Sequence, residues 1–169
     1  MKRLLNIGYW VILSFYVLLL INIVFISRDS LRSVNLIPFH SIKDYIMVDN
    51  GFGKIRLLDM NIWGNVLMFI PAGIYVILNN TKKTIGRNLL LIFIISLLIE
   101  IVQYIFTLGA TDIDDIILNV VGGLIGLVLF KALHKWLKDE YKVKQTITIL
   151  SLIIGLPVAA LTLILVIVN

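Results

Sequence analysis

Five long apolar stretches, separated by polar segments, dominate the pattern of this 169-residue chain. Four of them are easily long enough to cross roughly 30 Å of hydrocarbon as helices at about 1.5 Å per residue, and the second is near the short limit. They are Ile7–Ile26, Ile62–Leu78, Leu89–Phe106, Ile113–Leu133 and Ile147–Val168. The pattern therefore predicts an all-α fold, a polytopic membrane bundle of about five transmembrane helices.

The composition of the chain agrees with a membrane setting. Hydrophobic residues make up 60% of it and charged residues only 15%, whereas about a quarter of the residues of a soluble protein are charged. The chain has no cysteine, which excludes a disulfide framework and a thiolate metal site. Any metal would need oxygen or histidine ligands.

The first apolar stretch has one property of a secretion signal, because Lys2 and Arg3 precede it. It is too long for the apolar region of a signal peptide and lacks a small-x-small cleavage site, so we interpret it as a retained anchor. We expect four regions, an anchor at 1–33, a core of three transmembrane helices with an outer loop at 34–133, a basic cytoplasmic connection at 134–146, and a C-terminal transmembrane helix at 147–169.

Basic residues predict the orientation of the bundle. If the N-terminus is inside, ten of the fifteen Lys and Arg residues fall in cytoplasmic segments. The other five fall in the long first loop, namely Arg28, Arg32, Lys43, Lys54 and Arg56. The positive-inside rule therefore predicts N-terminus in and C-terminus out. The net charge of +5 then reflects cytoplasmic flanks that face anionic lipid, so we expect a multi-pass protein of the cell membrane with lipids as partners.

This orientation places the polar residues of three spans in one leaflet. Asp112 and Asp115 open the fourth span at its outer end, and Asn119 lies about 10 Å deeper. Glu100 lies at a similar depth, about 9 Å from the outer end of the third span. Asn65 enters the second span from the same side. Ionisable groups at such depths are costly, so we expect them to have a function.

Helical spacing arranges these residues in stripes. The fourth span carries one stripe, made of Asp112, Asp115, Asn119, Gly122 and Gly126. The third span carries another, made of Ser96, Glu100, Gln103 and Thr107, and Asn61 lies one turn before Asn65 on the second. Because lipid cannot satisfy polar groups, the stripes should face each other and enclose a small acidic and amide-rich pocket. The apolar turn Asn35–Phe39 and the adjacent His40, in the first loop, can cap that pocket.

Four short motifs give the chain a resemblance to a known family. They are N35-x-x-P-F39 in the loop, Asn65 with Phe69, Pro71 and Gly73, Glu100 with Gln103, and Asp112 with Asp115, Asn119 and Gly122. Together they cover roughly Val34–Leu129 and are similar to the recurring elements of the VanZ-like family of bacterial membrane proteins. The fifth span lies outside the resemblance.

The resemblance implies a location, a site and a phenotype. The family's namesake is associated with low-level resistance to the glycopeptide antibiotic teicoplanin. The family motifs that match residues here imply a ligand-binding site at Asn35, Asn65, Glu100, Gln103, Asp112, Asp115 and Asn119. Many relatives carry an arginine shortly before the paired aspartates, but Phe106–Thr111 contains none. A fixed counter-charge is therefore missing, which leaves room for a cation or the amine of a ligand.

Several of these residues also have structural interpretations. Asn65, Gln103 and Asn119 could simply join helices, since interhelical hydrogen bonds in membranes contribute about 0.6 kcal/mol each. Glu100 is different, because an ionisable group at that depth is by default a functional candidate.

Carboxylates at a helix N-terminus cap the helix and complement its dipole. One of Asp112 and Asp115, together with Asp114, is therefore open to a purely structural role. Gly122 and Gly126 are more typical of packing than of chemistry. His40 has no second histidine on its side of the membrane, which argues against a histidine-rich metal site.

The sequence favours binding over catalysis, and no cofactor is expected. It lacks the glycine, arginine and second half of a membrane phosphatidyl-transferase motif, and Ser96 has no histidine at matched depth for a serine intramembrane protease. It also lacks a basic groove with interleaved aromatic residues, so no nucleic-acid partner is expected. Two hypotheses stay open, binding of a lipoglycopeptide or cell-wall precursor at the cell envelope, and a small proton- or ion-coupled transporter or flippase.

Overall fold

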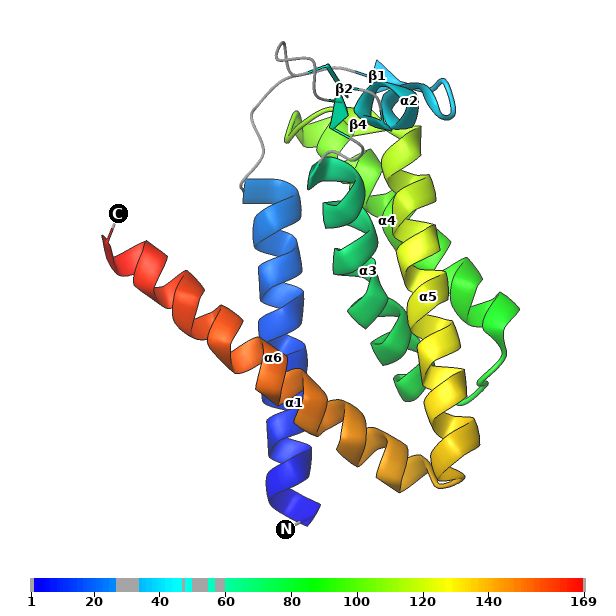
Figure 1. Cartoon of the computed structure of the whole chain (residues 1–169), viewed down its shortest axis with the longest axis vertical. Coiled ribbons are helices and arrows are strands. Elements are labelled where there is room, and N and C mark those ends of the chain that lie inside the picture. Colours follow the sequence, from blue (N-terminus) through cyan, green and yellow to red (C-terminus); the bar gives the residue numbers. More distant parts are fainter. Residues whose placement is uncertain (1, 27–33, 47, 50–54, 57–59, 169) are drawn as a thin grey trace. The chain divides into compact units, whose positions relative to one another are not determined.

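The computed structural model describes residues 2–26, 34–46, 48–49, 55–56 and 60–168. Figure 1 shows their order, which is α1 (Lys2–Ile21), a π-helical turn η1 (Asn22–Ile26), β1 (Val34–Asn35), α2 (His40–Ile46), β2 (Val48–Asp49), β3 (Ile55–Arg56), α3 (Met60–Asn79), α4 (Ile85–Phe106), β4 (Thr111–Asp112), α5 (Ile113–Leu137) and α6 (Glu140–Val168). Arg28, Arg32 and Lys54, which the orientation argument used, lie outside the described residues.

Five of the described helices are long and apolar enough to cross a membrane, which confirms the predicted all-α fold. They are α1 extended by η1, α3, α4, α5 and α6. The described strands are only two residues long and form two small ladders. Many leucines, isoleucines and valines on these helices are exposed, as expected for side chains that face lipid tails.

The chain forms two compact units. One joins residues 1–23 with residues 132–169, and the other contains residues 24–131. In the first unit, α6 crosses α1, where Gly155 approaches Ile12 and Gly8 lies near Leu152. The second unit holds α2, α3, α4 and most of α5.

Most of 134–146, the segment predicted as a basic cytoplasmic connection, is helical. Helix α5 continues to Leu137 and α6 starts at Glu140, so a turn of two residues joins them. Lys138 ends α5 in the left-handed conformation, with a φ of 54°. The Asp139 carboxylate caps α6 by accepting hydrogen bonds from the backbone N–H of Tyr141 at 2.8 Å and of Lys142 at 3.3 Å.

Glycines allow α5 to approach the backbone of α3 very closely. A Cβ atom at Gly122 would collide with the carbonyl oxygen of Val66, and one at Gly126 with the carbonyl oxygen of Ile70. Close contacts through small residues are the usual way in which membrane helices associate. The lower part of the predicted glycine stripe therefore serves as a helix-packing surface.

The outer loop closes one end of the second unit. Strand β1 pairs in parallel with β4, so that Val34 lies opposite Thr111 and Asn35 opposite Asp112. Figure 1 shows α2 at the same end, above the first turns of α3 and α5. Ile42 of α2 packs against a small buried cluster that includes Leu118 of α5. The loop thus covers the end of the unit where the polar residues gather.

Candidate functional site

Asp112 is the first anchor of the hydrogen-bonded cluster at this end. Its Oδ1 atom accepts hydrogen bonds from the backbone N–H of Asp114 at 2.9 Å and from the Nδ2 of Asn35 at 3.1 Å. Its Oδ2 atom accepts one from the hydroxyl of Ser41. Asp112 therefore caps α5 and at the same time holds the outer loop against it.

Asn35 shapes the apolar turn that follows it. Its Nδ2 also reaches the hydroxyl of Ser41 at 2.9 Å, and its Oδ1 accepts the backbone N–H of Ile37 at 3.1 Å. The second contact is an Asx turn, in which an asparagine side chain stabilises a bend two residues later. Asn35 thus fixes the turn from its first residue.

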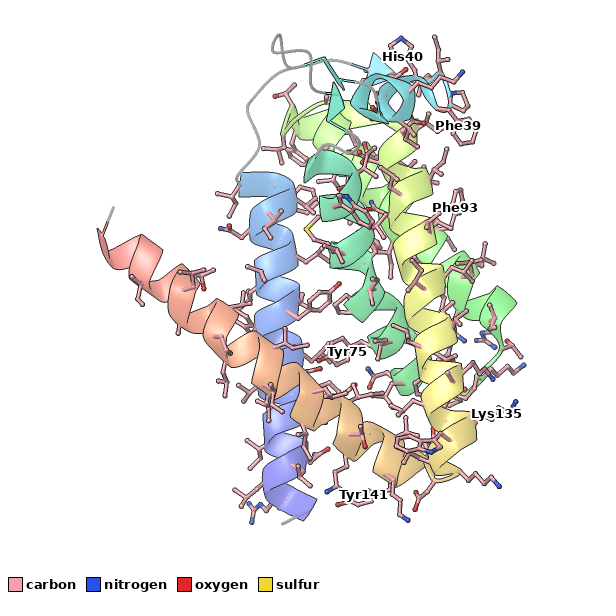
Figure 2. All side chains as sticks on the ribbon, viewed as in Figure 1. Phe39, His40, Tyr75, Phe93, Lys135 and Tyr141 are labelled. Atoms are coloured by element: carbon pink, nitrogen blue, oxygen red, sulfur yellow. The ribbon has the colours of Figure 1, made fainter. Side chains whose placement is uncertain are left out.

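Asp114 holds the last residue of the turn Asn35–Phe39. Its carboxylate is fully buried and accepts the backbone N–H of Phe39 at 2.6 Å and of Ile42 at 3.1 Å. Phe39 has a φ of 64°, a left-handed conformation that a phenylalanine rarely adopts without external support. Figure 2 shows Phe39 and His40 projecting outward from this end. Asp114 therefore caps α2 across the interface instead of its own helix.

Glu100 connects α4 to the start of α5. It is only 2% exposed, and its Oε2 atom accepts the backbone N–H of Asp112 at 3.0 Å. The hydroxyl of Thr111 lies 3.5 Å from the backbone carbonyl of Glu100. The predicted proximity of Glu100 and Asp112 is therefore present in the structure.

Two further contacts bring the predicted stripes face to face. The Nδ2 of Asn65 on α3 donates to Oδ1 of Asp115 on α5. One turn deeper, the Nδ2 of Asn119 donates to the hydroxyl of Ser96 on α4 at 3.0 Å. Asn65 therefore supplies a donor to a carboxylate of α5, and Asn119 joins α5 to α4.

Gln103 points to a different neighbour. Its Nε2 donates to the backbone carbonyl of Val24 in η1 at 2.9 Å. A π-helical turn does not use its carbonyl groups in the regular α-helical pattern, which makes one available to a side chain. Gln103 thus ties α4 to the end of the first membrane stretch, outside the chain of contacts that links Asn35, Asp112 and Glu100.

Two buried amide oxygens in this region lack a hydrogen-bond donor within the described residues. They are Oε1 of Gln103 and Oδ1 of Asn119, whose side chains are 0% and 4% exposed. An unsatisfied buried acceptor costs about 1–3 kcal/mol, so such atoms are rare unless a water or ligand serves them. Within the described residues, these two oxygens are therefore acceptors that are available to a water or a ligand.

The polar cluster ends at the level of Ser96 and Asn119. One turn further along α4, the buried Ile92 packs so closely on Gly123 of α5 that a Cβ atom there would collide with it. The next polar residue of α4, Asn88, is buried at the opposite end, where it donates to the carbonyls of Lys82 and Thr84. Asn88 therefore belongs to the turn between α3 and α4.

Sequence reasoning underestimated Asp114 and did not select Ser41. Asp114 lies about 200° around the helix from Asp112, so no stripe argument could pair it with the other polar residues. Its partners are backbone N–H groups, which every residue except proline has, so the sequence cannot identify them.

Among the described residues, no group of three His, Asp or Glu side chains could hold a metal ion.

Comparisons with known proteins agree with the resemblance seen in the motifs. The model of the family described as VanZ/LLP1 matches residues 8–134, which extends the resemblance backward to include most of α1. The chain is 35% identical over 122 residues to Protein VanZ of Enterococcus faecium, an alignment that covers 70% of this chain and 65% of that protein. No solved structure matches the chain.

Proposed function

We propose a function for this chain from its family, since it belongs to the VanZ/LLP1 family. It binds an amphiphile of the cell envelope at the outer face of the cell membrane. The ligand class is a lipoglycopeptide of the teicoplanin type or a cell-wall precursor, and the outcome is low-level resistance to that antibiotic. Glu100, Gln103 and Asn119 contact the ligand in this proposal. Asn35, Asn65, Asp112 and Asp115 hold the surrounding frame.

The observation that carries the proposal is the pair of buried amide oxygens, on Gln103 and Asn119, that accept no hydrogen bond from the described residues. Both accept hydrogen bonds only, so their complement is a donor such as an amine or an amide N–H. On α4, Glu100 lies one turn from Gln103 and one turn from Ser96, the residue that contacts Asn119. The Glu100 carboxylate also attracts amines and N–H donors. The chemistry of the site therefore favours a ligand that carries N–H groups.

The apolar turn supplies the second half of an amphiphile site. Leu36, Ile37 and Phe39 are exposed, although Asn35 and Asp114 hold the turn firmly. Exposed apolar residues at the end of membrane helices lie where acyl chains enter the bilayer. A ligand with an acyl chain can therefore contact the turn while its polar part reaches the site.

A resistance assay with Glu100→Gln tests the proposal. Expression of the unmodified chain in a susceptible Gram-positive host should raise tolerance to teicoplanin more than to vancomycin, because only teicoplanin carries an acyl chain. Glu100→Gln should remove that gain while the amount of protein in the membrane stays the same. Asn88→Ser is the matched control, a polar substitution on the same helix at the opposite end. Equal tolerance in cells with Glu100→Gln and with the unmodified chain would contradict the proposal.

The competing function is proton- or ion-coupled transport. Transport needs a polar path through the membrane, whereas the contact of Ile92 with Gly123 separates Ser96 from Asn88 in this conformation. A binding role needs no such path and should survive collapse of the proton gradient. If an uncoupler raises cell-bound fluorescent teicoplanin to the level of cells without the protein within minutes, transport is the better account.

A further inference from the structure

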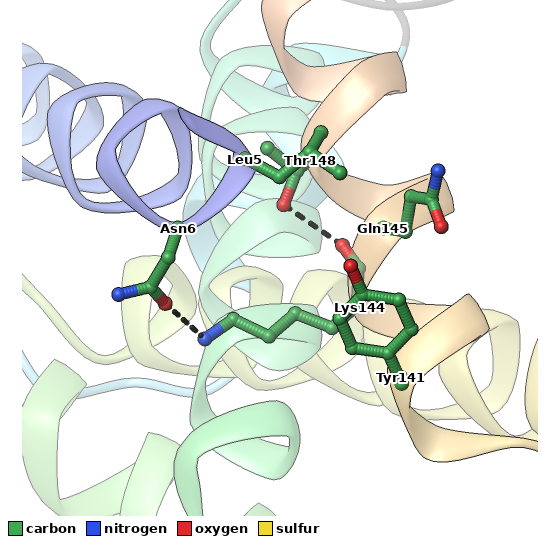
Figure 3. Close-up of a pocket in the computed structure, with 6 residues that line it drawn as sticks. All are labelled: Leu5, Asn6, Tyr141, Lys144, Gln145 and Thr148. Carbon is green, nitrogen blue, oxygen red and sulfur yellow. Dashed lines mark hydrogen bonds between the residues drawn. The ribbon is translucent and has the colours of Figure 1, made fainter. Parts of the chain in front are cut away.

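An open hollow lies between α1 and α6, near the first turns of both helices. Figure 3 shows the residues that line it, which are Leu5, Asn6, Tyr141, Lys144, Gln145 and Thr148. Its volume is about 270 Å³. All of these residues belong to the unit formed by 1–23 and 132–169, so the hollow shares no residue with the polar cluster of α3, α4 and α5.

Lys144 is held at the edge of this hollow by neutral groups. Its Nζ donates to Oδ1 of Asn6 at 3.0 Å and lies 4.2 Å from the ring centroid of the buried Tyr9. Neither contact cancels its charge, and an ammonium group has three donors, of which Asn6 uses one. Lys144 therefore presents a positive charge whose other N–H donors can bind a further group.

The rest of the lining suits the headgroup of an anionic lipid. Asn6 accepts from Lys144 through its oxygen, which leaves its amide N–H₂ to donate to another group. Of the carboxylates at the start of α6, Asp139 accepts from the backbone N–H of Tyr141, and Glu140 lies one turn before Lys144. The hollow thus combines one cation and an amide donor with the apolar side chain of Leu5.

The predicted orientation puts this hollow at the cytoplasmic surface, where anionic phospholipids attract lysines and arginines. Exposed apolar residues line both helices beyond it, including Leu4 and Ile7 on α1 and Ile149 and Ile153 on α6. We propose that the hollow binds the phosphate of an anionic phospholipid, whose acyl chains lie against these exposed surfaces. The charge of Lys144 selects the lipid, and Asn6 holds that charge in place.

Native mass spectrometry of the full chain in detergent tests this proposal with phosphatidylglycerol as the probe. Lys144→Gln should lower the affinity for the first phosphatidylglycerol by about fivefold, because it removes the cation that contacts the phosphate. Lys142→Gln is the matched control, because it removes the same charge from the same helix at an exposed residue that does not line the hollow. Its affinity should stay within about twofold of that of the unmodified chain, because Lys142 does not contact the bound phosphate and an exposed charge contributes little. An equal loss in both variants, or no loss in Lys144→Gln, would overturn the proposal.

Two further measurements distinguish a lipid site from a site for soluble anions. Asn6→Asp should weaken phosphatidylglycerol binding as well, because a carboxylate there would pair with Lys144 and repel phosphate. This variant keeps the lysine, so it serves if Lys144→Gln does not fold. Inorganic phosphate and phosphatidylcholine should each bind more weakly than phosphatidylglycerol. If inorganic phosphate competes at equal concentration, the hollow is a site for soluble anions and the lipid assignment fails.

Discussion

At the residue scale, carboxylates of similar sequence context have different tasks. Asp112 caps its own helix, whereas Asp114 caps the helix of the outer loop. Asp115 faces α3 through Asn65. The difference arises because Asp112 precedes α5 as its cap, whereas Asp114 and Asp115 lie on the helix and point in directions about 100° apart.

The role of Asp114 predicts a specific loss of stability. Asp114→Ala leaves the backbone N–H groups of Phe39 and Ile42 without their acceptor, so the free energy of unfolding should fall by roughly 2–5 kcal/mol. Thermal unfolding in detergent measures the loss, and limited proteolysis should show faster cleavage near Phe39. Asp139→Ala removes the cap of α6 alone and breaks no contact with another segment, so it should cost about 1 kcal/mol. Similar losses in the two variants would contradict the bridging role of Asp114.

Gln103 permits a test that separates binding from stability. Gln103→Met removes one interhelical hydrogen bond, worth about 0.6 kcal/mol, but it also removes a buried oxygen that has no donor. Thermal stability in detergent should therefore change little, whereas tolerance to teicoplanin should fall toward that of cells without the protein. A variant that is clearly destabilised but fully active would show that Gln103 only joins helices.

At the element scale, the sequence predicted the long helices and their polar stripes but not the turns between them. Periodicity and length identify a membrane helix, so Glu100 and Asn119 could be placed on facing stripes without a structure. The pairing of Asn35 with Asp112 depends on the path of the intervening chain, and the left-handed Phe39 depends on an acceptor 75 residues away. The sequence did not reveal that α5 and α6 extend into 134–146, because the lysines there match both a solvated segment and a helix surface.

The contact between α3 and α5 predicts that glycines on these helices differ in their tolerance to substitution. Gly126→Ala places a Cβ against the carbonyl of Ile70, so it should lower the free energy of unfolding by roughly 1–3 kcal/mol. Gly64→Ala adds a Cβ on α3 where no atom lies within 4 Å, so it should be neutral or stabilise by up to about 1 kcal/mol. Thermal unfolding of both proteins in the same detergent checks the difference. Equal effects would mean that α5 does not approach α3 this closely.

At the scale of the whole molecule, the distribution of basic residues predicts the orientation of the chain. Lys83 is one of the lysines that are predicted to lie on the cytoplasmic side. Its Nζ donates to the carbonyls of Ile77 and Leu78 at the C-terminal end of α3, where a positive charge complements the helix dipole. The polar cluster lies at the opposite end of the same helix, where Asn65 contacts Asp115. The end that is predicted to face the cytoplasm is therefore basic, and the end that is predicted to face outward is acidic.

Cysteine labelling tests the orientation directly, since the chain has no cysteine of its own. A cysteine placed at Thr111 should react with an impermeant maleimide in intact cells. A cysteine placed at Lys138, in the turn between α5 and α6, should react only after permeabilisation. The reverse pattern would put the polar cluster at the cytoplasmic surface and rule out a role in binding extracellular antibiotics.

The parallel pairing of β1 with β4 imposes an order on biosynthesis. Asn35 and Asp112 are 77 residues apart, and a ribosome that adds about 5–20 residues per second needs roughly 4–15 s to extend the chain over that length. Until α5 leaves the translocon, the turn at Phe39 lacks the carboxylate that holds its left-handed backbone. The contact between Phe39 and Asp114 can therefore form only after the start of α5 has been made, so protection of the turn from protease should follow the synthesis of that helix.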